Sequence, residues 1–295
     1  MAFSLQPDEQ LIHGVVRLLL GQLDSGIAYL AAQEGDPVEA IHETRKALKR
    51  IRTTLRLLRG ALGSSRFKSE NRRFAELARK LAPARDAQML VKAAERLAKH
   101  AAGSPYAEAV APVLHALQGR VPTQPLDEEL LRELVGSLQS ARERLQTYLL
   151  ELSPRSVRSS FRRGVRRMMR RGRSAYTLAY SEPSDDNFHA WRKRIKDLYY
   201  ASCLLHLTRP AKLAPLVDML DGMADDLGDE HDLSILASAI HRDPKSLGGA
   251  VPVALVLQLI ARRREELRQA LRQPGRDLYR KSAKRVARRL TDAMP

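Results

Sequence analysis

The chain has 295 residues, of which 44% are hydrophobic and only 5% aromatic. That is enough apolar material for a sizeable core, in one large domain or two of ordinary size, and it favours helices over sheets. The formal net charge of +17 predicts a polyanionic partner: nucleic acid, an anionic membrane or polyphosphate.

A period of about 3.6 residues runs through almost the whole chain, and no window shows the alternation of a strand. This period, with its glycine and proline punctuation, predicts helices over residues 8–33, 37–61, 66–81, 85–102, 105–118, 126–152, 155–173, 185–207, 211–227, 230–242, 252–272 and 275–292. No low-complexity linker separates two halves. We therefore expect an all-α fold whose halves pack together.

The chain begins with MAFSLQPDEQ, which is acidic and lacks the apolar segment of a secretory signal. The longest apolar stretch, at residues 251–261, is too short and too interrupted to span a bilayer. A lone cysteine, Cys203, excludes an internal disulfide framework and is expected to be a packed thiol. These features predict a cytoplasmic protein without membrane insertion.

The helix expected over 37–61 contains the basic sequence HETRKALKRIRTTLRLL. At 100° per residue, the side chains of Arg45, Lys49, Arg52 and Arg56 fall within about 80° of His42, and the apolar side chains fall opposite. We expect the apolar stripe to face the core and the basic stripe to face away from it. Over its length of about 21 Å, one cation per turn suits an extended anion better than a single phosphate.

Positive charge is concentrated in three segments. Residues 42–59 hold seven basic residues and one acid, residues 155–173 hold nine arginines and no acid, and residues 262–289 hold twelve basic residues and three acids. Together their surplus exceeds that of the whole chain, so the remainder is net acidic. Such segregation favours a binding site over general solubility.

The basic motif occurs twice. HAWRKRIKDLYYASCLL repeats the pattern 147 residues later and aligns His189, Arg192, Lys193 and Lys196 with His42, Arg45, Lys46 and Lys49. A second pair, KLAPARDAQML and DLGDEHDLSIL, follows at an offset of 146 and aligns Asp86 with Asp232. Two ordered matches at one spacing predict an internal duplication and a pseudo-twofold pair. Tyr199 and Cys203 replace the arginines of the first stripe, so the second stripe is shorter.

A row of acids near helical spacing allows two interpretations. The acids are Asp218, Asp221, Asp225, Asp229 and Asp232. They could hold a divalent ion that bridges to phosphate, but pairing with arginines of neighbouring helices is the favoured interpretation. The chain contains no glycine-rich phosphate loop, nucleophile elbow or zinc spacing. We therefore expect no enzyme activity, no catalytic residues, no cofactor and no metal, with a phosphohydrolase as the less favoured reading.

Sequence-nonspecific nucleic-acid binding is the main alternative, because phosphate contacts would produce the same segregation of charge. Against it, the repeated motifs carry no Asn or Gln to read base edges. Their basic stripes also lack interleaved aromatics for base stacking, apart from Tyr199 and Tyr200.

The two histidine-headed helices resemble those of the CHAD domain, the conserved histidine α-helical domain. LAPARDAQML and LGDEHDLSIL resemble the Leu-Gly-x-x-Arg/Asn-Asp segments that follow these helices in that family, with Pro83 and Ala84 as departures. The resemblance covers the whole chain. It implies a single CHAD domain over 1–295, built of two similar four-helix bundle units, 1–150 and 151–295, related by pseudo-twofold symmetry.

The resemblance also implies a basic central groove that binds inorganic polyphosphate, with location at polyphosphate granules. Since no Glu-x-Glu-x-Lys motif of a fused triphosphate tunnel metalloenzyme occurs, we expect a stand-alone binding module. Whether the two histidines contact the ligand or brace their helices stays open, as do chain-length preference and oligomeric state. The implied ligands are His42, Arg45, Lys46, Lys49, Arg52, Arg56, His189, Arg192, Lys193 and Lys196, with Arg163, Arg166, Arg167 and Arg170 from the basic helix.

Overall fold

The fold is all-helical throughout the part of the chain that the structure, a computed structural model, describes: residues 3–32, 37–81, 83–120, 127–247, 249–292 and 294. The all-α prediction is confirmed. The α-helices are α1 (Leu11–Ala31), α2 (Pro37–Leu62), α3 (Ser64–Lys80), α4 (Pro83–Ala101), α5 (Ala107–Gln118), α6 (Glu128–Leu150), α7 (Pro154–Ser181), α8 (Asp185–His206), α9 (Pro210–Arg242), α10 (Ala250–Arg280) and α11 (Ala283–Thr291). A short 3₁₀ turn, Lys245–Leu247, precedes α10.

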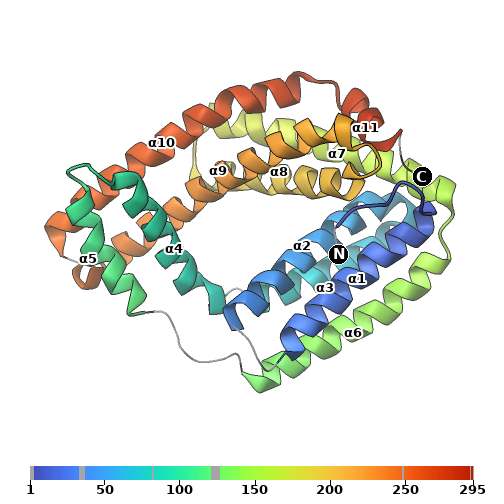
Figure 1. The fold of residues 1–295 in the computed structure, drawn as a ribbon, viewed down its shortest axis with the longest axis horizontal. Helices are drawn as coiled ribbons and strands as arrows, with labels where there is room; N and C mark the ends of the chain where they lie inside the picture. The colour runs from blue at the N-terminus through green and yellow to red at the C-terminus, as the bar shows by residue number, and fades with distance from the viewer. Residues whose placement is uncertain are drawn as a thin grey trace.

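The apolar side chains form two cores. The larger joins α1, α2, α3, α6, α7 and α8 with the first part of α9, the end of α10 and α11. The smaller joins α4 and α5 with the far half of α9 and the first half of α10, at the left of Figure 1. Each core therefore takes side chains from both sides of residue 150, where the sequence was divided. That division and the pseudo-twofold symmetry stay predictions.

Three predicted helix boundaries are wrong. Helix α7 runs past residue 173 to Ser181, α9 runs through Gly228, and α10 runs through Pro274 to Arg280. Proline inside a helix costs about 3 kcal/mol. Leu271, Leu278 and Tyr279 are buried around it, and each contributes about 1.5–3 kcal/mol by burial. Packing therefore outweighs the local preference of proline to end the helix.

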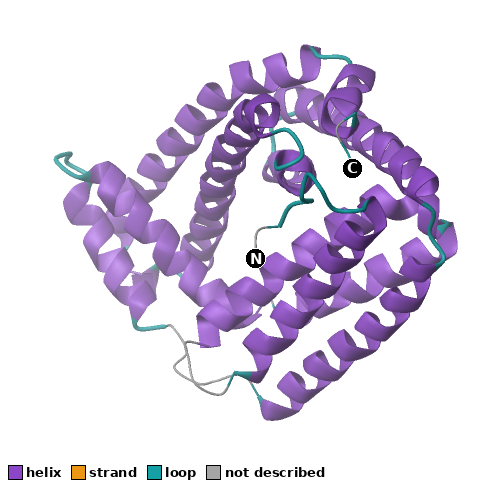
Figure 2. Ribbon diagram, turned by 45° about the vertical axis from the view of Figure 1, so that its right-hand side comes forward, coloured by secondary structure: helices purple, strands orange, loops and turns teal. Residues whose placement is uncertain are grey.

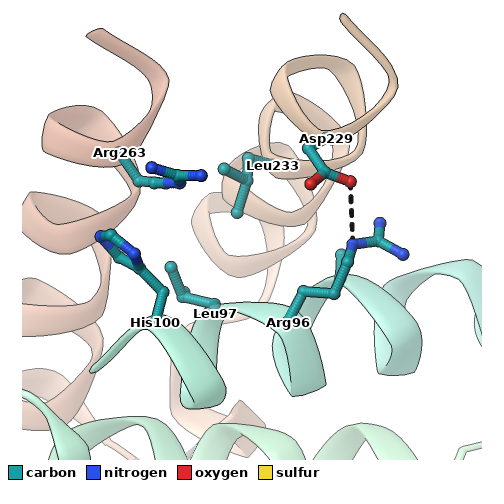
Figure 3. Close-up of a pocket in the computed structure, with 7 residues that line it drawn as sticks. Arg96, Leu97, His100, Asp229, Leu233 and Arg263 are labelled. Carbon is teal, nitrogen blue, oxygen red and sulfur yellow. Dashed lines mark ion pairs between the residues drawn. The ribbon is translucent and has the colours of Figure 1, made fainter. Parts of the chain in front are cut away.

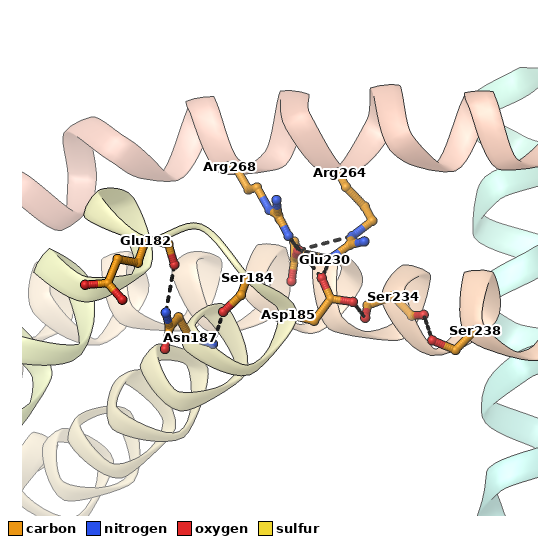
Figure 4. Close-up of polar contacts among 9 residues, drawn as sticks. All are labelled: Glu182, Ser184, Asp185, Asn187, Glu230, Ser234, Ser238, Arg264 and Arg268. Carbon is orange, nitrogen blue, oxygen red and sulfur yellow. Dashed lines mark hydrogen bonds and ion pairs between the residues drawn. The ribbon is translucent and has the colours of Figure 1, made fainter.

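Helix α8 is positioned at its start by side chains of three helices. Ser184 caps it by accepting a hydrogen bond from the Asn187 amide at 3.2 Å. Asp185 accepts hydrogen bonds from Ser234 of α9 and Arg264 of α10 (Figure 4). Glu230, only 1% exposed, accepts from Arg264 at 2.8 Å and from Arg268 of α10 at 2.6 Å. This network fixes the turn from which the second histidine helix begins.

Helices α2 and α7 cross at unusually close range. A Cβ on Gly164 would lie 3.0 Å from the Cα of Leu57, so glycine permits the approach. Ser160 donates to the Leu57 carbonyl at 2.7 Å and accepts from the Gly60 amide at 2.8 Å. The crossing brings the arginines of α7 to those of α2. Figure 2 shows how helices joined by short loops make up the described chain.

Candidate anion-binding site

The first half of the α2 stripe is partly exposed. The side chains of His42 and Lys46 are 42% and 38% exposed, and both lie near Glu43, at 3.8 Å and 3.0 Å from its Oε1. Lys49 is exposed one turn further on. Arg45 reaches α3, where its Nη1 donates to the Ala78 carbonyl at 2.8 Å. This end of the stripe offers cations to solvent, as expected.

The second half of the stripe does not face away from the protein, and this expectation was wrong. Arg52 and Arg56 are half-buried where α2 meets α3 and α8. Arg52 donates through Nε to Asn71 of α3 at 3.3 Å. Burial, with the charge of Arg56, lowers the pKa of Arg52 to about 10. Periodicity assigned these side chains to one face correctly, but it could not show that other helices cover part of that face.

A buried carboxylate joins α2 to α8. Asp197, 8% exposed, lies 3.0 Å from Arg56 Nη1 and 3.2 Å from Arg194 Nη1. Burial lowers the pKa of Arg56, and the charges of Arg194 and Arg171 lower it further, against the opposing effect of Asp197. The guanidinium groups around this carboxylate therefore outnumber it and repel one another.

Helix α7 adds further cations to the same place. Arg167 donates to the Arg56 carbonyl at 3.3 Å. Burial lowers the pKa of Arg167, as do the charges of Arg59, Arg163 and Arg170. Three of the four arginines expected from the basic helix thus lie around the end of the α2 stripe. The fourth, Arg166, is exposed on α7, and no contact given by the structure joins it to this group.

An open depression of about 450 Å³ lies between α7 and α8. Its lining residues are Arg170, Arg171, Ser174, Ala175, Ala190, Lys193 and Arg194. Burial lowers the pKa of Lys193, and the charges of Arg194 and Arg52 add to this effect. The depression therefore continues the electropositive region at the end of α2. We name the region the cation cluster; its members are Arg52, Arg56, Arg163, Arg167, Arg170, Arg171, Lys193 and Arg194.

The remaining cations of the second motif face α9 instead. The ring of His189 stacks on that of His231, with centroids 3.9 Å apart and planes at 25°. Burial and the charges of Lys193 and Arg192 lower the pKa of His189 to about 4. Burial and the neighbouring ring lower that of His231 to about 3. Both rings are therefore neutral at pH 7, and the buried Nδ1 of His189 has no hydrogen-bond partner among the described residues.

Acids of α9 line this second face and pair with cations. Asp225 lies 3.9 Å from Lys196 Nζ, while Asp229 and Asp232 lie 3.0 Å and 2.7 Å from Arg96 of α4. Figure 3 shows the Arg96–Asp229 pair beside a small cavity of about 60 Å³ between α4, α9 and α10. Within the described residues, no cluster of His, Cys, Asp or Glu is suited to hold a metal ion.

The structure thus brings part of the predicted set together. Contacts and mutual charge effects join Arg52, Arg56, Arg163, Arg167, Arg170 and Lys193. His189, Arg192 and Lys196 of α8 face α9. One continuous groove stays a prediction.

The sequence reasoning missed Arg171, Arg194 and His231. Arg171 belongs to the nine-arginine segment, but Arg194 lies off the repeated motif. A signal for His231 was present, because it aligns with Arg85, a cation in the same place of the other copy. The side chains of Arg85 and Asp86 lie outside the described residues.

An all-helical fold with a histidine-headed basic helix in each half of the sequence defines a narrow class of helical domain. The family model of the CHAD domain matches residues 17–241. The chain therefore belongs to the CHAD-domain family, as the motifs suggested.

The chain is also similar to a solved structure, the crystal structure of the CHAD domain from the plant Ricinus communis. The TM-score is 0.56 over 93% of this chain and 94% of that one, at 16% sequence identity, which supports the fold alone. A search of curated proteins found no match. Within the described residues, no helix has the length and apolarity to cross a membrane.

Proposed function

We propose that this protein binds inorganic polyphosphate and that the cation cluster is the centre of the binding site. The observation that carries the proposal is the excess of guanidinium groups at the junction of α2, α7 and α8, around the carboxylate of Asp197, which contacts two of them. Burial lowers the pKa values of Arg52, Arg56 and Arg167, and repulsion between neighbouring guanidinium groups lowers them further. A phosphate chain laid along the cluster would relieve that repulsion. On the same ground we propose that the protein is located at polyphosphate granules.

The residues of the cluster suit phosphate in complementary ways. Arg170 and Arg171 offer planar forks for bidentate contacts at the edge of the α7–α8 depression, and Lys193 offers a mobile point charge. We infer binding without chemistry, because guanidinium and ammonium groups hold phosphate but supply no nucleophile or general base. The exposed first half of the α2 stripe, with His42 at its head, would extend the contact.

Nucleic acid is the alternative ligand, and two features disfavour it. Tyr200 is buried and Tyr199 is half-buried against the larger core, so neither presents a fully exposed ring on which a base can stack. The cluster is also partly enclosed by three helices, which suits a thin chain better than a wide duplex.

A competition assay tests the proposal. Labelled long-chain polyphosphate would be bound to the protein at two salt concentrations and challenged with excess single-stranded or duplex DNA. We expect polyphosphate to remain bound. Displacement by equal amounts of DNA would overturn the proposal in favour of a general phosphate-backbone binder.

A matched pair of variants locates the site. The double variant Arg170→Gln with Arg171→Gln removes two exposed cations of the depression. We expect its affinity for polyphosphate to fall roughly tenfold or more, which corresponds to a loss of about 1.4 kcal/mol or more of binding free energy. Arg72→Gln with Arg79→Gln removes the same charge from α3, where both side chains are 75% exposed. Equal losses in the two variants would show that only net charge matters.

A further inference from the structure

The end of α10 and the whole of α11 carry a cationic surface that the cation cluster does not include. Between Asp277 and Asp292 the sequence has six basic residues and no acid. We call this surface the C-terminal ridge; its members are Arg280, Lys281, Lys284, Arg285, Arg288 and Arg289. We propose that the ridge is a second polyphosphate-binding surface, so that one protein molecule holds two chains or two segments of a chain. This inference rests on the proposed function.

The ridge is turned outward by the packing of α11. Val286, Ala287 and Leu290 are buried against the larger core, where α11 lies beside α7. All six basic residues of the ridge are exposed. Figure 1 shows α11 at the outer edge of the molecule, next to the C-terminus. The helix therefore presents one apolar face to the protein and one purely cationic face to solvent.

Among the described residues, no acid pairs with the cations of the ridge. Five of the six side chains have no ion pair or hydrogen bond among the described residues, and the sixth, Arg289, donates to the Lys212 carbonyl. Asp292, the acid that follows the ridge in the sequence, pairs instead with Arg162 of α7 at 3.0 Å. Lys284–Arg288 and Arg285–Arg289 are like-charge pairs at i,i+4, which oppose the helix.

In other cationic helices of this chain, arginines pair with buried carboxylates. Arg264 and Arg268 of α10 share Glu230, and Arg73 and Arg144 share Glu70. A face that needed only solvation could carry acids among its cations, as α10 does at Glu265 and Glu266. A ridge of six cations with no acid partner in the described part of the chain, on a protein whose α3, α6 and α10 arginines share buried carboxylates, indicates an external anion.

The ridge and the cation cluster lie on different sides of α7. Arg167 of α7 reaches α2, whereas Arg162 and Arg173 reach the other way, to Asp292 and to the carbonyls of Tyr279 and Lys281. A helix with its side chains is about 10–12 Å across. The two surfaces are therefore separate, and both can be occupied at once.

The form of the ridge favours polyphosphate over other polyanions. Its apolar side chains are buried, which leaves no anchor for insertion into an anionic membrane. The nine residues of α11 extend about 14 Å and form a narrow edge. Such an edge can follow a thin flexible chain closely, but it would touch few phosphates of a duplex.

Titration calorimetry with a short polyphosphate tests the inference, using the full chain. We expect two chains bound per protein molecule. Lys284→Gln, Arg285→Gln and Arg288→Gln together should reduce this to one, with the affinity of the remaining site changed less than twofold. The same variant should lose the turbidity that long polyphosphate produces with a bivalent protein. Circular dichroism checks that the helices remain.

The control removes three exposed cations elsewhere, by Lys68→Gln, Arg72→Gln and Arg79→Gln on α3, and should keep two bound chains. One bound chain in the unmodified protein, lost on Arg170→Gln with Arg171→Gln, would overturn the inference and leave the proposed function intact. One bound chain that disappears only in the ridge variant would overturn both. If duplex DNA or phosphatidylserine vesicles bound the ridge more strongly than polyphosphate does, the inference would also be overturned.

Discussion

Asp197 is a buried carboxylate at the junction of α2 and α8. It is 8% exposed and accepts two guanidinium groups, from Arg56 on α2 and Arg194 on α8. Removal of the carboxylate would leave two cations in a partly dry junction without their counterion. Loss of one member of a buried ion pair costs far more than the pair itself contributes.

The first prediction concerns this carboxylate. Asp197→Asn should lower the free energy of unfolding by about 3 kcal/mol, measured by urea denaturation. Asp24→Asn is the control, because the Asp24–Arg142 pair is 51% and 39% exposed, and it should change stability by less than about 1 kcal/mol. Equal effects in the two variants would show that the junction is solvated.

The second prediction concerns the stacked histidines. The pKa values of His189 and His231, about 4 and about 3, lie below the ordinary value near 6.5. In the unfolded chain both rings bind protons as the pH falls below about 6.5, whereas in the folded protein they do not until much lower pH. Their contribution to stability is therefore full above pH 6.5 and declines between about pH 6.5 and 3.

His231→Phe tests this, because it keeps a ring beside His189 and removes one titrating group. Urea denaturation at several pH values between 4 and 7 should show a shallower loss of stability for the variant. His13→Gln, on the exposed surface of α1, is the control and should follow the unmodified protein. A variant with the same pH profile as the unmodified protein would contradict the assignment.

At the scale of elements, the α2–α7 crossing positions the candidate site. The third prediction is that Gly164→Ala costs about 1–3 kcal/mol, because its Cβ would press on the backbone of Leu57. It should also weaken polyphosphate binding, since Arg167 would move away from α2. Gly136→Ala on α6 has no atom within 4 Å of the new Cβ and should stabilise by about 0.5–1 kcal/mol. Thermal unfolding and binding assays distinguish the two.

Periodicity and punctuation predicted most helices to within a few residues. The exceptions are informative: α7 continues past residue 173 to Ser181 because Tyr176 and Tyr180 pack against Trp191, and α10 continues through Pro274 for a similar reason. Tertiary packing determines where these helices end, and the local sequence pattern does not encode that packing. In the same way, the stripe on α2 was predictable, but the burial of Arg56 depends on where α8 crosses.

At the scale of the whole molecule, binding should depend steeply on salt. Each cation that replaces a counterion of a single-stranded polyanion adds about 0.7 to the slope of log K against log salt. The fourth prediction is that Arg170→Gln with Arg171→Gln lowers this slope by about 1.4. Anisotropy titrations of polyphosphate over a range of salt concentrations measure it. An unchanged slope would place the two arginines outside the contact.

The two aligned motifs lie on helices α2 and α8, as their periodicity predicted, while the internal duplication stays a prediction. The partners of α4 and α5 could not be predicted, because they lie far along the chain, in α9 and α10. Sequence comparison finds what is repeated. It does not find which apolar face of one copy covers which face of the other.

That smaller core has a consequence for how the protein is made. Val110 and Val113 of α5 emerge from the ribosome long before Val256 and Ile260 of α10, against which they are buried. At about 5–20 residues per second, the delay is on the order of 10 s. During synthesis the apolar faces of α4 and α5 therefore stay exposed to solvent until α10 is made. We expect a chaperone to bind the nascent chain at this helical hairpin.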